Sequence, residues 1–154
     1  MYINSINGEI TFKNFSIKKE MTLEEFEESD MCKYIHSKSQ PGAIFYVLKP
    51  EVTEKSEFII QLSFHPVTQK LILVGLGLSE SGRFSTWADW SEEKEIKKDK
   101  RHKEFLFNML GKSTTDDGTF VKYIYPWGMI ECGINAKDAT SGIFIGYSGH
   151  TWEI

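Results

Sequence analysis

Three stretches between residues 87 and 147 decide the fold: WADWSEEKEIKKDKRHKEFLFNMLG at 87–111, YPWG at 125–128 and IFIGY at 143–147. The first predicts one long charged helix over 91–110. Glu92 and Glu93 suit the positive end of the helix dipole, and Gly111 is favoured just past a helix end. The second stretch predicts a tight hairpin and the third an apolar strand. A helix followed by antiparallel strands describes an architecture rather than an active site.

The long helix must bury one stripe of side chains against a sheet. Its apolar spacing predicts that the stripe consists of Ile96, the stem of Lys103, Leu106 and Leu110, widened by Phe105, Phe107 and Met109. Residues 97–103 are nearly all charged. We therefore expect this middle part, including His102, to be solvated, with the helix packing only by its ends.

Three strands are predicted after the helix, at 119–125, 129–135 and 142–148. Pro126 supplies the φ of a type I turn, and Gly128 can adopt the left-handed position of a short hairpin loop. This arrangement places Trp127 at the hairpin tip. The last strand would bury one face, made of Ile143, Ile145 and Tyr147.

The first half of the chain also contains local signals for a hairpin and a short helix. Residues 9–17 read as a short hairpin. Thr22 and Glu25 form a capping box, in which each side chain accepts from the other residue's backbone amide, so a short helix is predicted over 22–29. Residues 30–42 give no clear pattern.

Strands are then predicted at 43–49, 56–64 and 70–78. The last two alternate, which is typical of strands with one buried face. That face would contain Phe58, Ile60, Leu62 and Phe64 in one strand and Ile72, Val74, Leu76 and Leu78 in the next.

Together these elements predict an α+β fold. We expect residues 1–154 to form a single domain, with an antiparallel sheet of about six or seven strands and two principal helices packed on it. A helix followed by three strands occurs twice in outline, at 22–78 and 91–148, so the chain could also consist of two related halves.

Composition and charge narrow the function classes. The net charge of −4 disfavours a nucleic-acid-binding protein. The chain has no apolar run near the roughly 20 residues of a membrane helix. It has no visible signal peptide, and Cys32 and Cys132 suggest two reduced thiols rather than a disulfide framework. We therefore expect a cytoplasmic protein without a membrane-spanning segment.

No residue pattern points to catalysis, a metal or a cofactor, and none is expected. The four histidines, His36, His65, His102 and His150, lack metal-ligand spacing. Cys32 and His36 could share a helical face, but no third group is marked to orient the imidazole. An enzyme of unmarked type remains the third alternative.

Two groups of residues are candidate partner-binding surfaces. The acidic cluster consists of Glu24, Glu25, Glu27, Glu28 and Asp30, and it is either a solvated helix face or a patch that docks a basic partner. The second group is Trp87, Trp90 and Trp127, together with Trp152. Trp87 and Trp90 are either lids on the core or exposed anchors for a partner.

The helix start at 89–95, the hairpin at 125–128 and the strand at 143–147 resemble those of small uncharacterised bacterial proteins, some of which are immunity proteins of toxin–immunity pairs. This resemblance implies a cytoplasmic protein that binds and blocks one cognate toxin and has no activity of its own. The three motifs would mark the scaffold rather than the toxin contact. The alternative is a small-ligand or carbohydrate-binding domain that uses its aromatic side chains.

Overall fold

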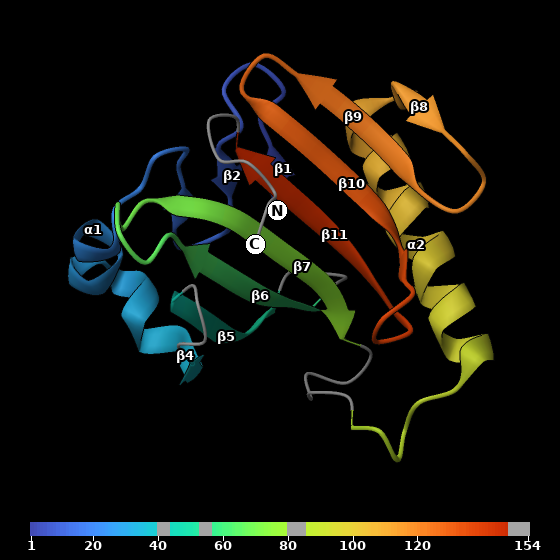
Figure 1. Ribbon diagram of the computed structural model, residues 1–154, viewed down its shortest axis with the longest axis horizontal. Coiled ribbons are helices and arrows are strands. Elements are labelled where there is room, and N and C mark those ends of the chain that lie inside the picture. The colour runs from blue at the N-terminus through green and yellow to red at the C-terminus, as the bar shows by residue number, and fades with distance from the viewer. Residues whose placement is uncertain (40–43, 53–56, 80–85, 148–154) are drawn as a thin grey trace.

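An eight-stranded antiparallel sheet forms the body of the fold (Figure 1). The computed structural model describes residues 1–39, 44–52, 57–79 and 86–147. Across the sheet, the strands are β4 (Ile35–Ser39), β5 (Ile44–Val52), β6 (Glu57–Phe64), β7 (Leu71–Ser79), β11 (Thr140–Tyr147), β10 (Gly128–Asn135), β9 (Val121–Tyr125) and β8 (Thr115–Asp116). The sheet thus consists of two four-stranded meanders that meet where β7 pairs with β11.

Rows of apolar side chains cross the sheet on one face because the strand registers align them. One row runs from β5 to β9 through Leu48, Ile60, Leu76, Ile143, Cys132 and Val121. The next row contains Tyr46, Leu62, Val74, Ile145, Ile130 and Tyr123. All twelve side chains are buried. This inner face carries the core, and the predicted alternation in β6 and β11 is confirmed.

A second, three-stranded sheet covers part of this face. It is formed by β1 (Tyr2–Ile3), β2 (Ile10–Thr11) and β3 (Ser16–Ile17), and the last two are the hairpin predicted over 9–17. Each strand contributes one fully buried isoleucine, namely Ile3, Ile10 and Ile17. These residues join the same core cluster as the large sheet.

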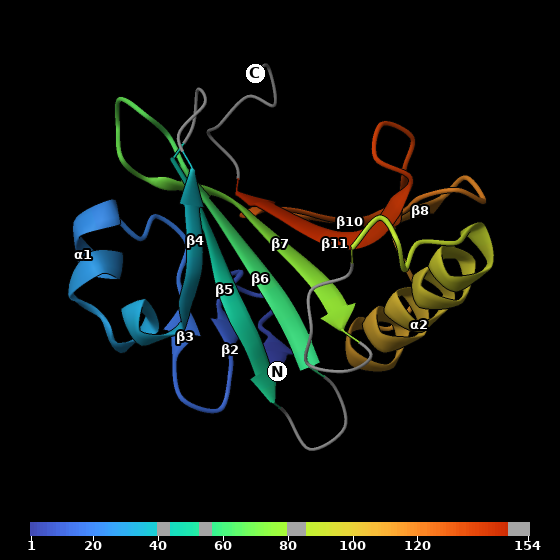
Figure 2. The ribbon, with the colours of Figure 1, turned by 90° about the horizontal axis from the view of Figure 1, so that it is seen from below.

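The helices lie at the two ends of the inner face (Figure 2). α1 (Leu23–Glu28) is followed by the 3-10 helix η1 (Asp30–Tyr34), and the ring of Phe26 packs against those of Tyr46 and Phe64. α2 (Glu92–Leu110) contacts β10, β11 and β7. No helix among the described residues is long and apolar enough to cross a membrane.

The α+β class with a large antiparallel sheet is confirmed, but the predicted numbers of strands and helices are wrong. Among the described residues, the large sheet has eight strands and the small one three, and only α2 is a principal helix, since α1 has six residues. The sequence patterns missed β1, β4 and β8 because these strands are short or mostly exposed, so they lack a long alternation. Each helix precedes one meander. That the halves 22–78 and 91–148 are related, and that the chain forms a single domain, both stay predictions.

A bulge corrects the predicted face of β7. Ser63 pairs with Leu73, but Phe64 pairs with Leu71, so Ile72 is an extra residue in the ladder. Leu71 is therefore fully buried and Ile72 is only partly so. Val74, Leu76 and Leu78 point inward as predicted.

Candidate functional site

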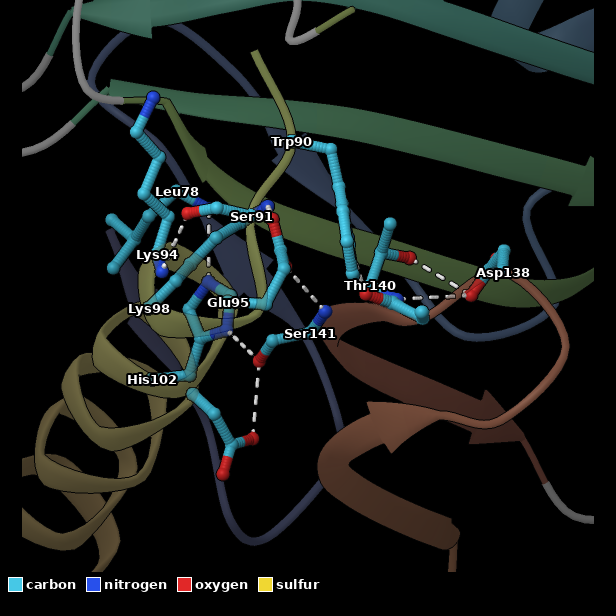
Figure 3. A network of polar contacts seen from close by, with 12 residues as sticks. Leu78, Trp90, Ser91, Lys94, Glu95, Lys98, His102, Asp138, Thr140 and Ser141 are labelled. Atoms are coloured by element: carbon cyan, nitrogen blue, oxygen red, sulfur yellow. Dashed lines mark hydrogen bonds and ion pairs between the residues drawn. The ribbon is translucent and has the colours of Figure 1, made fainter. Parts of the chain in front are cut away.

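A cluster of buried polar side chains joins α2 to β7 and β11 (Figure 3). His102 is fully buried and lies between the two strands. Its Nε2 accepts from the backbone N–H of Leu78 at 2.9 Å, and its Nδ1 lies 2.8 Å from the Ser141 hydroxyl oxygen. The Ser141 hydroxyl donates to Asp99 Oδ1 at 3.1 Å, and its backbone N–H donates to Glu95 Oε2 at 2.8 Å. α2 therefore contacts the sheet through polar as well as apolar groups.

The burial of Glu95, Asp99 and His102 corrects the predicted stripe of α2. Ile96 and Phe107, which were expected to be buried, are 54% and 60% exposed. The expectations that His102 is solvated and that the helix packs only by its ends are also wrong. An apolar pattern could not reveal the true face, because the buried polar groups are satisfied by atoms of distant strands.

The cluster contains a serine, a histidine and a carboxylate, but their hydrogen bonds run in the wrong order for a nucleophilic serine. The Leu78 N–H can only donate, so Nε2 must be unprotonated and Nδ1–H donates to Ser141. The hydroxyl proton of Ser141 then points to Asp99 rather than to the imidazole. His102 therefore has no free lone pair with which to activate Ser141, which a catalytic triad requires.

Charge in the cluster is balanced within α2. Lys98 lies 3.4 Å from Glu95 Oε2, and Lys103 lies 2.7 Å from Asp99 Oδ2. Burial, with additional repulsion from Lys98 and Arg101, lowers the pKa of His102 from its usual 6.5 to about 3. The imidazole is therefore neutral at physiological pH, which agrees with its acceptor role.

Exposed aromatic and aliphatic side chains gather on α2 and just before it. Trp87 is 75% exposed and Trp90 is 39% exposed, so neither is a lid on the core. The Trp90 indole N–H donates to the Ala139 carbonyl, which ties this segment to the turn between β10 and β11 (Figure 3). Ile96 and Phe107 are eleven residues apart, about three helical turns, and therefore project from the same side of α2.

Trp127 lies in the turn between β9 and β10, as predicted, but it is buried and is not an exposed partner-binding side chain. It is 4% exposed, and its indole N–H donates to the Ser5 carbonyl at 2.9 Å. The ring stacks on Tyr125 with centroids 5.1 Å apart and covers Gly8. Trp127 thus holds the N-terminal segment against the β9–β10 hairpin and has a structural role.

The acidic cluster 24–30 has several partners within the chain. Glu25 closes the capping box with Thr22, the Tyr46 hydroxyl donates to Glu27 at 2.8 Å, and Asp30 pairs with Lys33. For Glu24 and Glu28, the described residues supply no hydrogen bond or ion pair, and both are exposed. The repulsion among these acids is therefore offset in part within the chain, and docking of a basic partner at the cluster stays a prediction.

The remaining sequence candidates have ordinary structural surroundings. The Cys32 thiol donates to the carbonyls of Phe26 and Glu27, and burial raises its pKa, so it is not a ready thiolate. Burial raises the pKa of Cys132 to about 12. His36 lies on β4, and His65 Nδ1 accepts two amides of the β6–β7 turn.

His150 and Trp152 lie outside the described residues. Within the described part, no group of three or more His, Cys, Asp or Glu side chains is placed to hold a metal ion. Comparison of the chain with protein-family models, curated proteins and solved structures found no match.

Proposed function

We propose that this chain is a non-catalytic protein-binding module whose contact surface is the exposed side of α2 and the segment before it. The observation that carries the proposal is the exposure of four large side chains, Trp87, Trp90, Ile96 and Phe107. Exposed tryptophans rimmed by charged residues are typical anchors of protein interfaces, since their burial supplies much of the binding energy. We name these four residues the α2 surface.

We propose that the partner of the α2 surface is a cognate toxin, because the chain resembles immunity proteins. The three motifs behind the resemblance have structural roles: Ser91 caps α2, Trp127 packs on Gly8, and β11 pairs with β7 at the centre of the sheet. These roles support the expectation that the motifs mark the scaffold. Within the α2 surface, Trp90 belongs to the first motif, while Trp87, Ile96 and Phe107 lie outside all three. A carbohydrate ligand stacking on Trp87 is the second candidate, because that indole is 75% exposed.

Affinity capture from the native cell lysate, followed by mass spectrometry, tests the proposal. A protein retained by the wild type should be lost with Trp87→Ala/Phe107→Ala, and its affinity should fall about 30-fold or more, since loss of a hot spot costs about 2 kcal/mol or more. The matched control is Val67→Ala, which removes an equally exposed apolar side chain from the β6–β7 turn and should bind normally.

Two further arms separate the alternatives. Glu24→Lys/Glu28→Lys reverses the two exposed acids without an internal partner among the described residues, and binding should persist if the α2 surface is the contact. Co-expression of the captured protein should be toxic only when the wild-type chain is absent or altered at the α2 surface. Equal capture by all variants, or capture that a simple sugar competes away, would count against the proposal.

A further inference from the structure

The interface between α2 and the sheet changes character along the helix. Over the first three turns, the buried side chains are Glu95, Asp99 and His102, which are all polar. Apolar anchoring begins only at Phe105, whose ring packs on Phe58, and continues with the fully buried Leu106. The N-terminal part of α2 therefore depends on hydrogen bonds for its contact with β7 and β11.

His102 is the central group of this polar contact because both ring nitrogens are used. Nε2 accepts from the Leu78 amide, and Nδ1–H donates to Ser141. A proton on Nε2 would turn this acceptor into a donor that faces another donor. With His102 fully buried, the charge would also be placed away from water. In mild acid the ring can therefore be charged only if the contact opens.

We propose that His102 is a proton-operated latch: in mild acid its protonation releases the N-terminal part of α2, residues 92–102, from β7 and β11 while the rest of the sheet stays folded. The sheet itself is held by rows of buried side chains that take up no proton in mild acid. Their titratable members, Tyr46, Tyr123 and Cys132, have pKa values raised by burial and stay neutral. The latch is a local opening rather than a route to general unfolding.

The groups around His102 favour opening on protonation. On α2, Lys98 and Arg101 repel an imidazolium, whereas Glu95 and Asp99 already pair with Lys98 and Lys103.

The neighbouring strands offer no carboxylate to stabilise the charge from the inner face. β7 contains no titratable residue, β10 presents the neutral thiol of Cys132 to this side, and Tyr147 of β11 bonds to the Gly8 carbonyl at the far end of the strand. An imidazolium at this position would gain little from its surroundings.

The direction of the pH dependence follows from the pKa of His102. The pKa is about 3 when α2 is docked and about 6.5 when the ring is free in water. Between these values the open state binds the proton and the docked state does not, so docking is strongest above pH 6.5 and weakens as the pH falls. At pH 5.0 the opening equilibrium should exceed that at pH 7.5 by about 30-fold.

If the α2 surface is the partner contact, which rests on the proposed function, the latch would regulate binding. Trp90 and Ile96 lie on or beside the released segment, so opening would separate them from Phe107 and from the turn that holds Trp90. The complex would then dissociate faster in mild acid than at neutral pH.

Amide hydrogen exchange of the purified full chain, read by mass spectrometry at pH 7.5 and 5.0 and corrected for intrinsic rates, tests the latch without any partner. Peptides covering 92–102 should lose about 30-fold of their protection at pH 5.0. They should also remain less protected than those of β6 at both pH values, because a local opening has a lower free energy than global unfolding, which frees His102 as well. His102→Gln and His102→Asn, which place uncharged amide groups near the ring nitrogens, should remove the pH response. His36→Gln, the same change at an exposed histidine, should leave it intact.

Equal protection of 92–102 and β6 at pH 5.0, or the same response in wild type and in both His102 variants, would overturn the latch. The wild-type profile alone can do so even if neither variant folds. Because the measurement involves no partner, its failure would leave the proposed binding function untouched. Likewise, a failed capture experiment would leave the latch standing.

Discussion

Gly128 and Gly118 both adopt positive φ, at +154° and +87°, but their surroundings differ. A Cβ added at Gly128 would lie 2.1 Å from the Gly146 carbonyl oxygen, a backbone atom of the neighbouring strand. A Cβ at Gly118 would meet nothing within 4 Å. At the first position the close pairing of β10 with β11 therefore adds to the backbone strain, whereas at the second the strain acts alone.

We expect Gly128→Ala to destabilise the protein by about 3 kcal/mol or more, because strain and a backbone clash act together. Gly118→Ala, the matched control, should cost only about 1–2 kcal/mol. Urea unfolding followed by circular dichroism measures both free energies. Similar losses for the two variants would mean that β10 and β11 separate easily at this end.

At the scale of elements, α1 shows how a six-residue helix is maintained. Isolated helices of this length are unstable in water, so end contacts and packing must hold it. The Glu25 N–H donates to Thr22 Oγ1 at 3.1 Å, and the Thr22 N–H donates to Glu25 Oε2 at 2.7 Å. The buried Leu23 and Phe26 supply the apolar contact. The predicted capping box is confirmed.

Thr22→Ala should reduce the free energy of unfolding by about 0.5–2 kcal/mol, since it leaves the Glu25 amide without its acceptor. Glu25→Ala should weaken the same helix start by a smaller amount. Glu24→Ala alters the same turn without touching the box and serves as the control. Thermal unfolding that is unchanged by the first two substitutions would contradict the role of the box.

At the scale of the whole molecule, the seam between β7 and β11 unites the two meanders. Ile143 pairs with Leu76 and Ile145 with Val74, and all four side chains are at most 2% exposed. The seam lies in the middle of the eight-stranded sheet, four strands from each edge. Because both halves contribute to it, the seam should open only when the whole sheet does.

We therefore expect the amides of Leu71–Ser79 that bond to neighbouring strands to be among the slowest to exchange at neutral pH, at the rate of global unfolding. The edge strand β8, with two exposed residues, provides the contrast and should exchange orders of magnitude faster. Residue-resolved exchange by NMR gives both rates. Fast exchange in Leu71–Ser79 would show that the two meanders separate independently.

Only part of the candidate site could be read from the sequence. The sequence allows both a buried and an exposed position for Trp87 and Trp90, since a tryptophan before a helix can either cover a core or face a partner. Helical periodicity places Phe107 in the buried stripe, because it takes the more apolar side of a helix as the buried one. In α2 the buried side carries polar groups, so this rule selects the wrong side. His102 was missed for the same reason.

The sequence by itself determined where the main elements begin and end, because those signals are local. Thr22 and Glu25 start α1, Ser91 and Gly111 bound α2, and period-two alternation marks β6 and β11. Only the tertiary structure decided which side of α2 is buried and which segment covers Trp127. Their partners are far away in the chain: Leu78 and Ser141 for His102, and Ser5 for Trp127. A hydrogen bond between residues up to 122 positions apart leaves no periodic trace, since its two ends meet only after the sheet has formed.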